Sequence, residues 1–134
     1  MAQTEHLPIY KASYDLCLYL EQIVKNFSRY QKYALGADLR AGARKALALV
    51  VRANSRRDKV PVLLELREEL EALKVLLRLS RDAKAFANFH SFEHAITQVV
   101  DIARQNEGWL KSQHQSHGQN QGTMPVRLVD PSVP

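Results

Sequence analysis

Residues 35–57, LGADLRAGARKALALVVRANSRR, separate their apolar and basic side chains onto two faces of a helix. At about 100° per residue, one face carries Leu35, Leu39, Ala43, Ala46, Val50 and Ala53. The other face carries Arg40, Arg44, Lys45, Arg52 and Arg56. Because an apolar stripe needs a protein core to cover it, this segment predicts one wall of a helical bundle.

Positive charge is concentrated in the same part of the chain. The 134 residues have a formal net charge of +5. Residues 25–57 hold nine bases and one acid, Asp38, a net charge of +8, and so the rest of the chain carries −3. A basic face with almost no acids beside it is expected to lack an intramolecular partner and to meet an anion, more readily a long one. A polyanion, an acidic protein surface and a merely solvated face remain open at this point.

Three more helices are expected around the two-faced one. The four ranges are about 8–27, 31–54, 58–86 and 91–112. Pro8 and Pro61 suit first helical turns, while Asp58 and Ser91 are the expected N-caps. Short connections favour antiparallel neighbours, so the sequence predicts an all-α fold, an up-down-up-down antiparallel four-helix bundle.

The bundle domain is expected to span residues 8–112. Residues 1–7 are expected to form a flexible N-terminus, and residues 113–134, rich in Gln, Ser, His, Gly and Pro, a flexible tail. Gly36 and Gly42 weaken the two-faced helix by up to about 1 kcal/mol each relative to alanine. Facing the core, they would let another helix approach closely.

The third expected helix has more leucine than one buried face needs. Its core stripe is formed by Val62, Leu63, Leu66, Leu70, Leu73 and Leu77. A second stripe, rotated roughly 150° from the first, is formed by Leu64, Val75, Leu79 and Phe86. A bundle helix with an apolar back predicts burial against another chain, whereas scattered exposed leucines are the alternative.

The chain lacks the patterns that announce catalysis. It contains no glycine-rich phosphate loop, no HExxH, no GxSxG and no Cys/His ligand set, so the sequence predicts neither an enzyme nor a metal or cofactor site. The single cysteine, Cys17, leaves no disulfide within the chain and fits a reducing compartment. No apolar stretch is long enough to span a membrane, and a cytoplasmic location is expected.

Four segments together resemble a known family. They are LPIYKASYDLCLYLEQIVKNF (7–27), YALGADLRAGARKALALVVRANS (33–55), LLELREELEALKVLLRLSRDAKAF (63–86) and FEHAITQVVDIARQNEGWLK (92–111). They resemble the accessory variability determinant (Avd) proteins of diversity-generating retroelements. Those proteins lie within a wider group of four-helix-bundle proteins that includes the ones encoded in intervening sequences of bacterial 23S ribosomal RNA genes. The most telling pieces are YALGADLR, LLRLSRDAK and GWLK.

The resemblance implies a non-catalytic accessory protein in a homopentameric, barrel-like assembly. Its implied partners are the element's reverse transcriptase, the template RNA or DNA, and further copies of itself. The contacts expected for nucleic acid or polymerase are Arg40, Arg44, Lys45, Arg52, Arg56, Arg57, Arg78, Arg81 and Lys84.

Two other interpretations stay open. One is an interaction scaffold of the intervening-sequence type, with no reverse transcriptase partner. The other is a helical-bundle enzyme or toxin subunit, for which an arginine-histidine motif on a late helix is expected. Arg104 is followed by QNEGW, without a histidine, which counts against the enzyme.

Overall fold

The computed structural model describes residues 4–120, and every regular element within that range is helical. Four long helices dominate: α1 (Pro8–Val24), α3 (Ala37–Ser55), α4 (Val60–Asp82) and α5 (Phe89–Asn120). Three short elements complete the fold: the 3-10 helix η1 (Thr4–His6), the single turn α2 (Arg29–Gln31) and the π-helical turn η2 (Lys32–Gly36). No helix in the described range is long and apolar enough to cross a bilayer.

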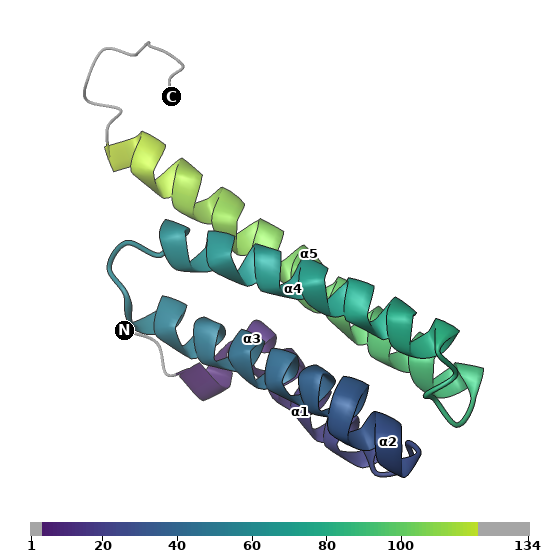
Figure 1. Ribbon diagram of the computed structural model, residues 1–134. Helices are drawn as coiled ribbons and strands as arrows, with labels where there is room; N and C mark the ends of the chain where they lie inside the picture. The colour runs from purple at the N-terminus through teal and green to yellow at the C-terminus, as the bar shows by residue number, and fades with distance from the viewer. Residues whose placement is uncertain (1–3, 121–134) are drawn as a thin grey trace.

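The four long helices form a closed ring of neighbours. Helix α1 packs on α3, α3 on α4, α4 on α5, and α5 returns to α1. Figure 1 shows each long helix running opposite to the one before it, which gives the up-down-up-down order. The predicted all-helical bundle is therefore confirmed for a single chain.

One apolar stripe from each long helix fills the core. The stripe predicted on α4 is confirmed, since all six of its residues are buried: Val62, Leu63, Leu66, Leu70, Leu73 and Leu77. On α3 the predicted apolar face is buried as well, with alanines at three of its positions. Small side chains there bring the α3 backbone close to its neighbours.

The connection between α3 and α4 differs from its prediction. Asp58 is not the N-cap; that position belongs to Lys59, and α4 begins at Val60 with Pro61 in its first turn. The Lys59 ammonium instead donates hydrogen bonds to backbone carbonyls at the end of α3. Its Nζ lies 3.0 Å from the oxygen of Ala53, 3.2 Å from that of Asn54 and 2.7 Å from that of Arg56. Lys59 thereby satisfies carbonyls that the helix end leaves without partners.

Both ends of α5 also differ from their predictions. The side chain of Asn88, not Ser91, caps the start: its Oδ1 accepts from the Ser91 N–H at 2.9 Å and from the Ser91 hydroxyl at 3.1 Å. The helix then continues to Asn120, so the predicted boundary at residue 112 is wrong. No proline interrupts the segment, and extending an existing helix needs no new nucleation. The remainder of the predicted tail lies outside the described residues.

The first described residues are tied to the bundle. Residues 4–6 form η1 within the segment predicted to be flexible, and Leu7 packs against the core. The amide of Asn54, near the end of α3, donates a hydrogen bond to the Thr4 hydroxyl at 2.9 Å.

Two glycines lie close to core side chains. A Cβ added at Gly36 would lie 2.5 Å from Cγ1 of Val24 and 3.3 Å from the backbone oxygen of Gln31. A Cβ at Gly42 would lie 3.1 Å from Cδ1 of Leu73. Gly108 on α5 differs, because nothing lies within 4 Å of its added Cβ.

The two kinds of glycine predict opposite effects of alanine. Gly36→Ala should lower the free energy of unfolding by about 1–3 kcal/mol, because the new methyl group overpacks the contact with Val24. Gly108→Ala should raise it by up to about 1 kcal/mol through helix propensity alone. Urea denaturation followed by circular dichroism measures both. A Gly36→Ala protein as stable as the original would contradict the close approach.

Candidate anion-binding surface

The basic side chains of α3 form two rows that face different neighbours. Arg40 and Arg44 reach toward α1, where both meet Glu21. The distance from Arg40 Nε to Glu21 Oε1 is 3.0 Å, and that from Arg44 Nη2 to Glu21 Oε2 is 2.7 Å. Arg40 also donates to the backbone oxygen of Glu21 at 3.0 Å.

The second row reaches toward α4. Lys45 Nζ lies 3.9 Å from a carboxylate oxygen of Glu65 and 3.6 Å from one of Glu69. Arg52 Nη1 lies 3.5 Å from Glu65. The prediction that the basic face lacks intramolecular partners is therefore wrong. Its acids come from α1 and α4, and they reduce the potential along the middle of α3.

Four of the predicted contact residues form no ion pair with an acid among the described residues. Arg56 and Arg57 are exposed where α3 ends, and Arg78 and Lys84 are exposed toward the end of α4. Among the side chains that the structure describes, none of the four takes part in an ion pair. Exposed, unpaired cations are the ones that an external anion meets first. Of the predicted contact residues, these four are therefore the ones that are both exposed and without an ion pair among the described residues.

Arg81 has a different environment from these four. Its Nε lies 2.9 Å from Oδ1 of Asp82, and its guanidinium lies over the Phe92 ring, 4.8 Å from the ring centre. The hydrogen bond from Arg81 lowers the pKa of the Asp82 carboxyl. Arg81 is thus partly engaged within its own chain.

Lys84 stands at the turn that ends α4. Its φ of 61° is the one positive φ among the described non-glycine residues. The Ala85 N–H donates to the Ser80 carbonyl at 2.9 Å, and the Lys84 N–H to the Arg81 carbonyl at 2.9 Å. These two bonds make a Schellman motif, in which glycine usually holds the left-handed position.

A group of exposed aromatic residues beside further bases was not predicted from the sequence. Tyr30 and Tyr33 are 82% and 75% exposed, and together with Arg29 and Ala34 they line a shallow hollow. Lys32 lies between the two tyrosines in the sequence. The alternation of bases and tyrosines in RYQKY was the available signal, and helical periodicity alone gives it no weight.

The second apolar stripe predicted on α4 is only partly exposed. Leu64, Val75 and Leu79 lie at the surface. Phe86 does not: it lies beyond the end of α4 and packs edge-on against Phe27 and Phe92, with ring centres 5.3 and 5.8 Å away. Phe86 is thus partly buried against the chain's own core, unlike the three exposed members of the stripe, and the predicted interface stays a prediction.

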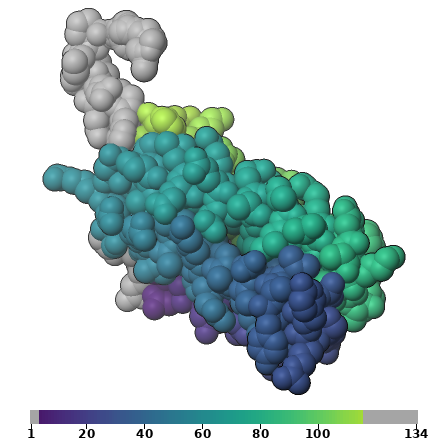
Figure 2. Space-filling model, viewed as in Figure 1, coloured from purple at the N-terminus to yellow at the C-terminus, as the bar shows by residue number. Residues whose placement is uncertain are grey.

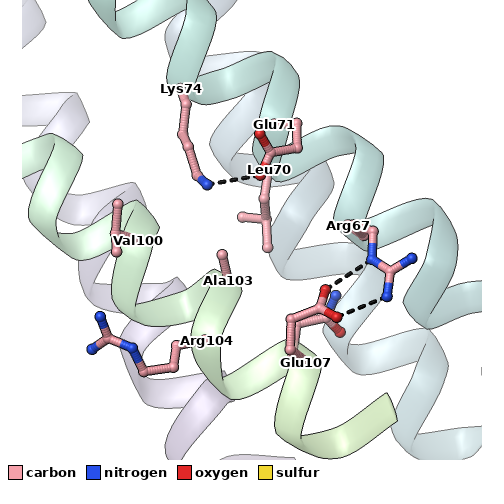
Figure 3. Close-up of a pocket in the computed structure, with 9 residues that line it drawn as sticks. Arg67, Leu70, Glu71, Lys74, Val100, Ala103, Arg104 and Glu107 are labelled. Carbon is pink, nitrogen blue, oxygen red and sulfur yellow. Dashed lines mark hydrogen bonds and ion pairs between the residues drawn. The ribbon is translucent and has the colours of Figure 1, made fainter. Parts of the chain in front are cut away.

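A hollow between α4 and α5 combines charged and apolar side chains, as an active site would (Figure 3). It is lined by apolar Leu70, Val100 and Ala103 and by charged Arg67, Glu71, Lys74, Arg104 and Glu107. Two hydrogen bonds of 2.8 and 2.7 Å join Arg67 to Glu107, and they lower the pKa of Glu107. Glu71 accepts from Lys74 at 2.7 Å. Both carboxylates are thus held by bases, and the lowered pKa of Glu107 is the opposite of the raised pKa that suits a general acid or base near neutral pH.

Metal-ligand types are also dispersed. Among the described residues, no three His, Cys, Asp or Glu side chains lie where they could hold one ion. Burial raises the pKa of the Cys17 thiol, so this half-buried cysteine is less reactive than a free one. Among the described residues, the exposed bases without ion pairs are therefore the candidate site, and an anion is the ligand that they would bind.

Comparison with protein families covers nearly all of this bundle. The family model described as bAvd-like matches residues 7–113. The chain belongs to the bAvd-like family. This confirms the resemblance to Avd proteins, and the match runs from Leu7 past Leu110, the last buried residue of α5 among the described side chains. No curated protein matches the sequence.

The left-handed turn of this bAvd-like bundle gives a test of the Lys84 position. Lys84→Gly should raise the free energy of unfolding by about 1 kcal/mol, because glycine adopts a positive φ without strain. Arg78→Gly removes the same charge within α4 and should lower the free energy of unfolding by about 1 kcal/mol. Thermal unfolding compares the two variants. A loss of stability in Lys84→Gly would argue against the described turn.

Proposed function

We propose that this protein is a non-catalytic accessory subunit of a diversity-generating retroelement. In this role it binds the reverse transcriptase and the template RNA, or DNA, and supports mutagenic cDNA synthesis. The observation that carries the proposal is the bAvd-like match over residues 7–113, since the family is of an accessory, non-catalytic type. The polymerase, and not this chain, would then hold the active site.

The charge distribution supports a nucleic-acid partner. Arg56 and Arg57 offer two adjacent, exposed guanidinium groups at one end of the bundle, and Lys84 lies at the turn that ends α4. Guanidinium groups bind phosphate through two parallel hydrogen bonds. Binding of this kind tolerates sequence changes in the nucleic acid and weakens steeply with salt.

Exposed apolar residues on α4 support assembly of several copies. Val75 and Leu79 are 59% and 54% exposed, and Leu64 lies on the same face of the helix, with Glu68 and Glu71 between them. We propose that this face contacts another copy of the chain in a pentamer. Five copies would multiply the phosphates engaged, and so raise affinity without any strong single contact.

Neutralising the adjacent arginines tests nucleic-acid binding. Arg56→Gln with Arg57→Gln should weaken binding of a labelled single-stranded RNA. The slope of log affinity against log salt should fall by about 1.4, since each phosphate contact to a single strand contributes about 0.7. Fluorescence anisotropy over a salt series measures both.

The matched control removes two charges elsewhere. Lys11→Gln with Arg104→Gln changes exposed bases that lie among acids, and it should leave the slope unchanged. If both double variants behave alike, the contact is set by net charge and not by this end of the bundle. If no RNA or polymerase binds while assembly persists, a scaffold of the intervening-sequence type is the better description.

Replacing the apolar face tests assembly. Val75→Ser with Leu79→Ser should reduce the molar mass measured by light scattering from that of an oligomer, five chains by this proposal, toward that of one chain. Leu18→Ser on α1 is the control, since Leu18 is also 54% exposed. A monomeric original protein would rule out this use of the α4 face.

A further inference from the structure

Two tyrosines project from the end of the bundle where the chain turns from α1 into α3. Aromatic side chains usually bury most of their surface, yet Tyr30 and Tyr33 remain largely exposed. Among the described residues, neither hydroxyl makes a hydrogen bond and neither ring contacts another ring. The faces of such rings are available for stacking against a planar group of a ligand.

The backbone that carries these rings is anchored on both sides. Ser28 begins α2 as its N-cap, and its hydroxyl accepts from the Gln31 N–H at 3.4 Å. The Gln31 side chain donates to the Ala83 carbonyl at 2.9 Å, which ties α2 to the end of α4. On the other side, Gly36 is buried against Val24. The rings are therefore presented by fixed backbone, which reduces the ordering cost of binding.

The charged residues nearest to the two rings in the sequence are all basic. No acid occurs between Glu21 and Asp38, whereas Lys25, Arg29 and Lys32 all fall in that interval. The bond from Gln31 to Ala83 also brings the turn containing Lys84 to the same end. Figure 2 shows this end as dark blue atoms at the lower right, with the green atoms of the α4–α5 connection beside them.

We infer that the α2–η2 patch, defined as Arg29, Tyr30, Lys32 and Tyr33, binds single-stranded nucleic acid by stacking bases on the two tyrosine rings. The inference rests on the proposed function and names the form of nucleic acid that this end of the bundle selects. Exposed aromatic rings within a basic surface are the usual platform for single strands, because every base has a face that can stack. Bases within a duplex keep their faces covered.

A protein partner fits this patch less well. Protein interfaces combine aromatic anchors with an apolar centre that excludes water. The hollow beside the two tyrosines is lined otherwise only by Arg29 and Ala34, and the charged residues between Glu21 and Asp38 in the sequence are all basic. In a nucleic acid, the phosphates would pair with the cations and the nucleobases would stack on the tyrosine rings.

The test compares ring removal with ring retention in the full chain. Tyr30→Ala with Tyr33→Ala should weaken binding of a fluorescein-labelled 20-nucleotide single-stranded RNA by at least about tenfold, since stacking on each ring contributes severalfold or more. Tyr30→Phe with Tyr33→Phe keeps both rings and should bind like the original protein. The corresponding RNA duplex should be bound equally by all three. A single-stranded DNA of the same sequence shows whether the 2′-hydroxyl matters.

Salt dependence separates stacking from charge. The alanine variant should keep the original slope of log affinity against log salt, because stacking releases no counterions. Arg29→Gln with Lys32→Gln should instead reduce that slope by about 0.7 per charge removed. Tyr14→Ala is the matched control, as Tyr14 is an exposed tyrosine that stacks on Tyr10 beside both acids and bases.

Each outcome bears on a definite claim. If the original protein binds single strands and the double alanine variant binds as well as Tyr14→Ala, the patch inference is wrong and the proposed function stands. If the original protein binds no nucleic acid, both are wrong. If the alanine variant keeps its RNA affinity but loses the reverse transcriptase, the patch is a protein contact, which also overturns the inference. Circular dichroism and urea midpoints equal to the original would show that all variants remain folded.

Discussion

Burial of the leucine row on α4 is the constraint on which the bundle depends. A fully buried leucine contributes about 1.5–3 kcal/mol relative to an exposed one, and α4 supplies more such residues than any other helix. The row packs between α3 and α5, and Leu73 meets the gap that Gly42 leaves. Once that row is covered, the rotation of α4 is fixed. Glu65 and Glu69 then face α3, and Val75 and Leu79 face solvent.

The same rotation redistributes charge. Glu65 and Glu69 of α4 and Glu21 of α1 meet bases along the length of α3. Exposed ion pairs of this kind contribute little to stability, about 0–1 kcal/mol each, but they cancel much of the local field. Arg56, Arg57 and Lys84, which take part in no ion pair among the described residues, lie where helices end. The bases without an acidic partner are therefore not those along the middle of α3.

Helical periodicity was enough to predict the four long helices and the buried row on α4. It was not enough for the ion pairs, because Glu21 and Arg44 lie 23 residues apart and meet only after two helices pack. Nor did it fix the helix ends: Asn88 and Ser91 are both good caps, and a displacement of three residues decides between them. Phe86 follows the periodicity of α4 but lies past its end, where the chain turns inward. Tyr30 and Tyr33 were missed because exposure in a connecting turn leaves no periodic pattern.

Helix α5 extends past the packed part of the bundle. Leu110 is buried, whereas none of residues 111–115 is, although the helix continues through them. Beyond Leu110 the helix is maintained by propagation along its own backbone and not by packing, and this balance shifts with temperature. Five residues of helix extend about 7.5 Å, at 1.5 Å per residue. The exposed extension is therefore expected to fray on warming before the packed core unfolds.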